Sequence, residues 1–593
     1  MLHKEISDIK CGLDYPSSDE EADPPEPEGA DGSKRYHHHQ GFLFGYSSLM
    51  HDMLELRPSP SQIFIIWEIF KDNVDPVMKL LHVPTVNHMI TKAAVNPGRL
   101  SKAAEALFYS ICFAAVVSMK DDQCDQLLGG TKNTLTDKYR FAVEQALARA
   151  SFLNSSNLMV LQALALFLTV VKFNDTSRSI WCLAALALQQ AQSQGLHRDP
   201  TNFKIPPFET EMRRRLWWHI YLQDARAAED YGADPVSQQI FYDTRMPLNV
   251  NDNDLVCDMT EPCAERIGAT DMTLCLVRFE LANMQRKLRI MTSAESDDQK
   301  RNSIKEKEKL IDAEHQRMQE TYFRHCDPNV PILWVASTIG KLILAKMWLF
   351  IHHPRLFQGD PSKNADDLRE QVFCTSVEVI VFGSLLEKGK HTSKWSWLFH
   401  TYNQWHAVAY VLSELCHKPP GPEYDRAWAA VEAVYDKRMM EYPRSQRGVL
   451  WRPLRLMYGR AKTRRTQLVN STSPDSNTDT NRTASADDNN VDDFAPTDGN
   501  GAENWLDSNP YMNALTESGD AFDFNINNQS FSQGGTMGSN LFGLPAGQAN
   551  LPPKIPMDTL PFSWNLGVAD YFDDFPMQIQ QTGWTPQTQQ EWH

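Results

Sequence analysis

The sequence predicts an all-α protein, in which an irregular, α-solenoid-like multi-helix domain is flanked by disordered acidic tails. Apolar residues recur at helical spacing through residues 60–465, and alternating strand patterns are nearly absent there. Negative charge is concentrated towards both ends of the chain. No fixed-period repeat is visible, which favours irregular packing of the helices.

Helical periodicity and local start and stop signals define the individual elements. Thr134 and Asp137 suit the start of one helix, Gly195 suits the end of another, and Pro354 follows the end of a third. The most apolar run, residues 158–171, is shorter than the roughly twenty residues needed to cross a bilayer, so we expect a buried helix and no membrane partner. The expected helices cover residues 62–70, 101–119, 135–150, 157–173, 177–194, 209–228, 271–291, 303–323, 332–352, 364–388, 394–417 and 423–440.

The 593-residue chain has a formal net charge of −17, which is unevenly distributed. Residues 1–40 have a net charge of −6, residues 41–468 about +4 and residues 469–593 −15. The two end segments are too polar to bury enough apolar surface to offset chain entropy. We therefore expect a disordered acidic N-terminal tail over 1–40, a helical domain over 41–468 and a disordered tail over 469–593. Without a strongly basic domain, DNA contact is predicted to be weak or indirect.

The C-terminal tail interleaves aromatic residues with acids, a composition typical of amphipathic activation segments. Acids keep such aromatics solvated until a coactivator groove accepts them, whereas an inert solubilising tail is the alternative. The candidate activation anchors are Trp505, Phe522, Phe524, Tyr571, Phe572 and Phe575.

A basic segment closes the helical domain. It is compatible with a nuclear localisation signal and equally with the polar face of a last helix, where cations favour the helix dipole. Its basic residues are Arg452, Arg455, Arg460, Lys462, Arg464 and Arg465.

No catalytic, cofactor-binding or metal-binding motif is visible. The nucleophile elbow, the His-Glu-x-x-His zinc motif and the Gly-rich phosphate loops are all missing from the sequence, so we expect neither an enzyme nor a cofactor. The ten cysteines include no Cys-x-x-Cys pair, and their dispersal suits a reducing intracellular compartment.

The most informative segment is the expected helix over 209–228. Three arginines, Arg213, Arg214 and Arg215, precede Leu216 and the pair Trp217-Trp218. Asp224 falls on the same apolar face as Trp217 at helical spacing. Because an unpaired buried charge is costly, we expect Asp224 to have a basic or hydrogen-bonding partner. A core helix with a basic start is the simpler interpretation of this segment.

This segment resembles the central motif of the fungal-specific transcription factor domain, together with Gly232, Pro235 and the stretch 241–249 that contains Pro247. The helix at 179–188 followed by Gly-Leu-His-Arg-Asp at 195–199, and the stretches 67–76 and 81–85, resemble further segments of that family in the same order. Ala184-Ala185 and Ala233-Asp234 depart from residues common in the family.

The resemblance implies an all-helical regulatory domain in a nuclear transcription regulator of a fungal pathway, with secondary-metabolite gene clusters as a frequent target class. Members of the family usually carry an N-terminal six-cysteine zinc cluster, but only Cys11 precedes residue 112 here. Either the protein works without its own zinc-cluster reader, or an N-terminal exon is missing from the sequence. The expected partners are the transcription machinery or coactivators at the C-terminal tail, and a homodimer or heterodimer partner. Alternatives are a co-regulator that pairs with a DNA-binding relative and, more remotely, a metabolic enzyme on a helical fold.

Overall fold

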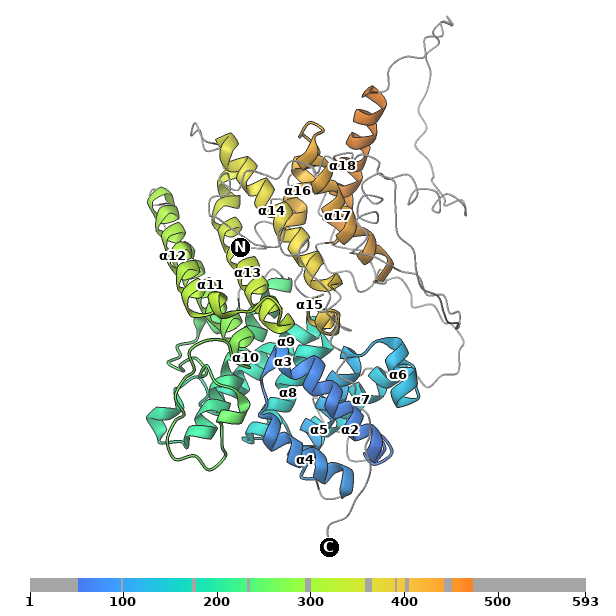
Figure 1. The fold of residues 1–593 in the computed structure, drawn as a ribbon, viewed down its shortest axis with the longest axis vertical. Helices are drawn as coiled ribbons and strands as arrows, with labels where there is room; N and C mark the ends of the chain where they lie inside the picture. The colour runs from blue at the N-terminus through green and yellow to red at the C-terminus, as the bar shows by residue number, and fades with distance from the viewer. Residues whose placement is uncertain are drawn as a thin grey trace, which may run out of the picture. The chain divides into compact units, whose positions relative to one another are not determined.

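The structure, a computed structural model, describes residues 52–96, 100–172, 178–231, 235–293, 300–357, 365–389, 392–399, 405–441 and 451–472. Every regular element in these ranges is a helix, which confirms the all-α prediction for the described part of the chain (Figure 1). The expected tail over 1–40, and all but the first residues of the expected tail over 469–593, lie outside the described residues.

The first helices pack around α5, which is buried along nearly its whole length. Its sequence is apolar on every side, and α2, α7 and α8 cover it. α9 packs against α8 and α10. The bounds are α2 (Pro60–Ile69), η3 (Phe70–Val74), α3 (Asp75–Met78), α4 (Val83–Val95), α5 (Lys102–Ser118), α6 (Asp121–Leu128), α7 (Lys132–Arg149), α8 (Leu158–Val171), α9 (Arg178–Ser193), η5 (Pro200–Phe203) and α10 (Pro207–Tyr231).

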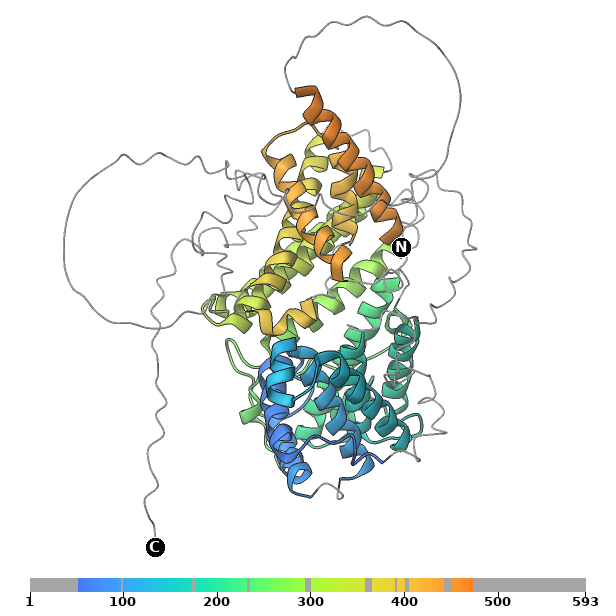
Figure 2. The same cartoon turned by 90° about the vertical axis from the view of Figure 1, so that its right-hand side faces the viewer.

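The later helices form a second group, which is joined to the first through α11. α11 packs against α3 and α10 and also against α12 and α13, while α14 contacts α13, α16 and α17 (Figure 2). The bounds are η6 (Val236–Gln239), η7 (Asp252–Asp254), α11 (Thr273–Ser293), α12 (Lys300–Thr321), η9 (Phe323–His325), α13 (Pro331–Phe357), α14 (Ala365–Lys388), η10 (Ser393–Trp395), α15 (Ser396–Phe399), α16 (Trp405–Leu415), α17 (Pro422–Glu441) and α18 (Trp451–Thr472).

Four sequence expectations about the elements were wrong. Pro354, which was expected to follow the end of a helix, lies inside α13, because that helix continues to Phe357. α4 and α6 were not expected, and the single helix expected over 394–417 contains η10, α15 and α16 instead. The expected cap Thr134 lies inside α7, because Thr131 is the N-cap and its side chain accepts from the backbone N–H of Thr134. Gly195, as expected, follows α9 with a φ of 75°, a left-handed conformation that favours glycine at a helix end.

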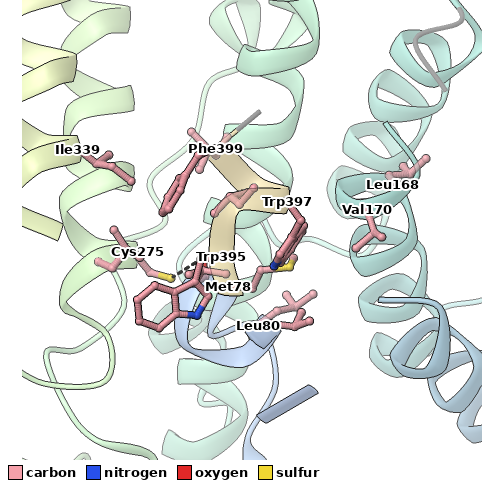
Figure 3. Packing of buried hydrophobic residues seen from close by; sticks show 14 of the residues in the cluster. Met78, Leu80, Leu168, Val170, Cys275, Ile339, Trp395, Trp397 and Phe399 are labelled. Carbon is pink, nitrogen blue, oxygen red and sulfur yellow. Dashed lines mark hydrogen bonds between the residues drawn. The ribbon is translucent and has the colours of Figure 1, made fainter. Parts of the chain in front are cut away.

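The two groups are also connected at the π-helical turn η3. The indole Nε1 of Trp395 donates to the carbonyl of Asp72 at 3.2 Å, and Nε1 of Trp397 donates to the carbonyl of Asn73 at 3.1 Å. Because a π-turn interrupts the regular α-helical bonding pattern, it leaves carbonyls available to such distant donors. Buried side chains from both groups form one hydrophobic core, and Figure 3 labels Met78, Leu80, Leu168, Val170, Cys275, Ile339, Trp395, Trp397 and Phe399 from it.

One helix in the described ranges is long and apolar enough to cross a membrane, namely Pro331–His352 within α13. Residues 158–171, the most apolar run of the sequence, form α8, which is shorter than this window. The Pro331–His352 window is 61% buried inside the protein, where α13 packs on α11, α12 and α14. Such burial is the pattern of a core helix.

Candidate functional site

The three consecutive arginines of α10 reach three different surroundings. Arg213 is partly exposed, and its Nε lies 2.8 Å from Glu209 Oε1 one turn earlier, while Nη1 donates to the carbonyl of Gln194 at 3.3 Å. Successive residues on a helix point about 100° apart, so the next two side chains leave this edge and enter the protein.

Arg214 forms a buried two-point ion pair with Asp199. Its Nε and Nη2 each lie 3.0 Å from a different carboxylate oxygen of Asp199, the fork geometry that arginine favours. Asp199 also accepts from the backbone N–H of Arg245 at 2.9 Å and from Thr201. Burial alone would raise the pKa of Asp199, but the hydrogen bonds from Arg214, Thr201 and Arg245 together lower it well below its usual value. Asp199 thus connects its own segment and the segment around Arg245 to α10.

Arg215 is fully buried, with 0% of the residue exposed. Its Nε donates to Glu211 Oε1 at 2.9 Å, and its Nη1 donates to Asp252 Oδ1 at 2.8 Å. The second oxygen of Glu211 accepts from the backbone N–H of Leu248 at 3.0 Å. The guanidinium therefore connects α10 to the 3-10 turn η7, about forty residues later in the chain.

Asp252 continues this network to the beginning of the domain. Lys79 Nζ lies 2.7 Å from Asp75 Oδ2, 3.1 Å from Asp252 Oδ2 and 3.8 Å from the half-exposed Asp271. Lys79 caps the C-terminus of α3 with a left-handed φ of 40°, and it lies four residues, about one turn, beyond Asp75. The imidazole Nε2 of His82 donates to the carbonyl of Asp252 at 3.0 Å.

The buried charges of this network do not balance. Two cations, Arg215 and Lys79, are enclosed with three carboxylates, those of Glu211, Asp75 and Asp252. Burial raises the pKa of Asp75 to about 6, although Lys79 opposes the shift. Burial acts in the same direction on Asp252, but Arg215 and Lys79 outweigh it and lower the pKa of Asp252. Of these two aspartates, Asp75 is therefore the one that takes up a proton first.

An aromatic cluster holds the stretch after α10 against the same helix. The ring of Tyr242 lies 5.7 Å from that of Trp217, 5.6 Å from that of Trp218 and 5.5 Å from that of Tyr221, measured between ring centroids. Trp218 Nε1 donates to the carbonyl of Arg245 at 2.9 Å. Edge-on and tilted aromatic contacts of this kind add to the burial of the rings themselves.

Asp224 is buried on the face that also carries Trp217. Its Oδ2 accepts from the backbone N–H of Ser237 at 2.7 Å, in the turn η6 that follows Pro235. Burial raises the pKa of Asp224, against the opposing effect of the hydrogen bonds from Ser237 and Val236. The partner of this carboxylate is thus a hydrogen-bonding backbone group.

The remaining residues selected from the sequence divide into two sets. Leu216, Pro235 and Pro247 are buried around α10. Gly232 lies outside the described residues, as do all the candidate activation anchors, which are Trp505, Phe522, Phe524, Tyr571, Phe572 and Phe575.

The acids that neutralise the arginines were not among the residues predicted from the sequence. Glu209 and Glu211 each precede an arginine by four residues, and this spacing on a helix could have predicted both pairs. Asp75 precedes Lys79 by the same spacing, whereas the contact of Lys79 with Asp252 had no comparable signal, because most of the domain separates the two residues.

The arrangement is structural in character. Its charged groups pair with one another and with backbone groups. These contacts connect α10 to the segments around residues 79, 199, 245 and 252. No group of three or more His, Cys, Asp or Glu side chains in the described ranges could hold a metal ion, and the nine cysteines found there are all free.

Comparison with protein families gives a match over much of this region. The model described as the fungal specific transcription factor domain matches residues 67–316, a range that includes Lys79, the whole of α10 and Asp252.

Curated relatives align over a longer part of the chain. The Aurofusarin cluster transcription factor aurR2 of Gibberella zeae is 30% identical over 383 residues, which is 64% of this chain and 57% of that protein. The transcriptional regulator AacuB of Aspergillus aculeatus is 30% identical over 68% of this chain and 55% of its own length. The Pyriculol/pyriculariol biosynthesis cluster transcription factor 1 of Pyricularia oryzae is 30% identical over 67% of this chain and 54% of its own length. The chain therefore spans little more than half the length of these relatives.

Proposed function

Residues 67–316 are a fungal-specific transcription factor domain, and from this premise we propose that the chain is a nuclear transcription regulator of a fungal pathway, with a secondary-metabolite gene cluster as its target. The observation that carries the proposal is the alignment, over about two thirds of this chain, with relatives named as cluster transcription factors. Deletion of the gene followed by transcriptome profiling tests it. Loss of transcripts from one neighbouring gene set is expected, and an unchanged transcriptome with an accumulated metabolite would favour an enzyme instead.

The buried network around α10 supports a scaffold role for this domain. Its ion pairs connect residues near 79, 199, 215 and 252, so a displacement of one of these segments disturbs its contacts with the others. A regulatory domain needs such a body to relay a bound partner or ligand to the rest of the protein. In this proposal the regulatory domain covers residues 41–468 and the activating tail covers residues 469–593.

Nuclear import is assigned to the basic residues of α18. This segment is helical, and Arg455, Arg460, Lys462 and Arg464 are exposed on it. Arg465 differs, because its Nη1 lies 2.7 Å from Glu432. A fluorescent fusion in which the four exposed residues are changed to glutamine should lose nuclear accumulation, and unchanged nuclear fluorescence would rule out this segment as the signal.

A second candidate function is a co-regulator that acts through a DNA-binding relative, as a homodimer or heterodimer. The observation that favours it is that the three consecutive arginines of α10 are paired with carboxylates and so are not available to contact phosphate. Gel-shift titration of promoter DNA separates the two candidates. A regulator that reads DNA itself binds the promoter selectively alone, whereas a co-regulator shifts it only when the relative is added.

A further inference from the structure

A small cavity lies where α8, α9, α10 and α11 meet. Its volume of about 50 Å³ is enough for roughly four water molecules. α3 and α15 complete the wall, so the cavity borders both helix groups. It is lined by Met78, Leu168, Thr169, Lys172, Ile180, Ala184, His219, Leu222, Gln223, Arg226, Ala227, Arg278 and Leu398.

The charged lining of this cavity is entirely cationic. Lys172, Arg226 and Arg278 contribute to the wall, and none of the lining residues is an aspartate or a glutamate. Arg226 also lies 4.0 Å from Glu229, which is outside the wall. Seven of the other lining residues are apolar, and surroundings of low polarity strengthen the field of the cations inside the cavity.

Arg278 is the residue that points to a ligand. It is only 7% exposed, and its Nη1 donates to the carbonyl of Val77 at 2.9 Å. Its Nε is buried without a hydrogen-bond partner, and no carboxylate of the described residues lies within ion-pair distance of it. Arg214 and Arg215, by contrast, each face a buried carboxylate. Because a buried guanidinium without a counter-charge is costly, the cavity beside Arg278 is suited to an anion.

Two neighbouring groups refine the chemistry of that anion. Gln223 Nε2 donates to the carbonyl of Ala165 and to the hydroxyl of Thr169, while its Oε1 is buried without a partner. The free amide oxygen can accept from a hydroxyl group. His219 Nε2 donates to the carbonyl of Met78, and burial followed by the charges of Arg278 and Arg215 lowers the pKa of His219 well below its usual value. His219 is therefore neutral and supplies shape rather than charge.

We propose that this cavity binds a small organic carboxylate that carries a hydroxyl group, with the carboxylate on Arg278 and the hydroxyl on Gln223. The size of the cavity restricts the ligand, or the part of it that enters, to about five non-hydrogen atoms. Four helices contribute to the wall, so an occupied cavity holds them together more firmly than an empty one. This binding assignment does not depend on the proposed role in transcription.

Titration calorimetry of the purified full chain with glycolate, acetate and acetamide tests the proposal. Glycolate should bind saturably with a Kd between about 0.01 and 10 mM, which is within the limit for so few atoms. Acetate should bind about 3–10 times more weakly, because it lacks the hydroxyl. Acetamide, which is neutral, should not bind. At ten times its Kd, glycolate should raise Tm by about 1–2 °C.

Three variants locate the binding. Arg278→Met should weaken glycolate binding at least tenfold. Gln223→Glu should abolish it, because the new carboxylate lines the same cavity, neutralises its positive charge and repels the carboxylate of the ligand. Lys287→Met is the matched control, since Lys287 is an exposed cation on the same helix and should leave the Kd unchanged.

Several results would overturn the assignment. These are equal binding of acetamide and acetate, unchanged affinity in folded Arg278→Met, or equal loss in the Lys287→Met control. If Arg278→Met does not fold, folded Gln223→Glu with wild-type affinity would be equally decisive. Inorganic phosphate that binds more tightly than glycolate would replace the organic ligand by an inorganic one.

Discussion

Replacement of Arg215 by methionine tests whether the charge network holds the domain together. Arg215 is fully buried, and its guanidinium makes charge-assisted hydrogen bonds of 2.9 Å to Glu211 and 2.8 Å to Asp252. Each such bond contributes about 1.5–3 kcal/mol, and removal of one partner from a buried ion pair costs about 3–5 kcal/mol. Methionine fills a similar space without charge, so the three carboxylates of Glu211, Asp75 and Asp252 would remain with Lys79 as the one other buried cation of the network.

The expected loss is therefore about 4 kcal/mol, and the assay is thermal unfolding followed by circular dichroism at 222 nm. In a cooperative unit of about 400 residues, this loss lowers Tm by about 5 °C. Arg213→Met is the matched control, because it removes the same side chain two positions earlier from a partly exposed pair with Glu209. Such a pair contributes about 0.2–0.5 kcal/mol, so the control should change Tm by less than about 1 °C.

A further variant identifies the origin of the loss. Combining Arg215→Met with Glu211→Gln removes one of the two orphaned charges and should recover part of the lost stability. Equal effects of Arg215→Met and Arg213→Met, or no recovery in the double variant, would refute the reasoning that buried charge pairing stabilises this region.

Three other predictions follow from the same structure and from the tail. Asp75→Asn should flatten the pH dependence of Tm. The pKa of Asp75 is raised from 3.8 to about 6, so between these values the folded state holds a proton that the unfolded state has lost. The stability of the wild type should therefore fall by on the order of 2 kcal/mol as pH rises from about 4 to 6. Parallel Tm profiles of wild type and variant would contradict this. Asp224→Ala leaves the buried N–H of Ser237 without an acceptor and should lower the free energy of unfolding by about 1–3 kcal/mol at pH 7. Asp224→Asn keeps an acceptor and removes a poorly solvated charge, so it should cost less. Equal Tm values for the two variants would contradict this role of the hydrogen bond. Residues 471–593 fused to an unrelated DNA-binding domain should activate a reporter, and alanine at all three aromatic residues of 571–575 should lower that output at constant charge; a silent fusion would identify the tail as a solubilising segment.

The sequence predicted the helices that carry long apolar patterns and missed those that do not. α5, α8 and α10 are long and rich in buried side chains, so periodicity located them to within a few residues. α6 spans eight residues of which only Cys124 and Leu128 are buried, and so short a pattern carries little signal. α4 begins with Val-Pro directly after a turn, and its short apolar pattern did not suggest a helix although proline suits the first positions of one.

The site was predictable to the extent that its contacts are local. Asp224 was expected to be buried because it shares the helical face of Trp217, and the pairs within α10 follow from a spacing of four residues. The contact of Lys79 with Asp252, and those of Trp395 and Trp397 with η3, join residues that only the folded chain brings together. Neither periodicity nor spacing carries information about such pairs.

The run of three arginines shows why a basic cluster in a sequence is weak evidence for nucleic-acid binding. In the extended sequence the three side chains form one positive patch, but helical geometry points them about 100° apart. Arg213 remains at the surface with Glu209, Arg214 is neutralised by Asp199, and Arg215 lies in the core between Glu211 and Asp252. A phosphate contact requires a cation that is exposed and not already paired, and these three fail one condition or both. The motif instead uses its charge inside the protein, where each guanidinium joins α10 to a different partner and so fixes the direction in which the chain leaves the helix.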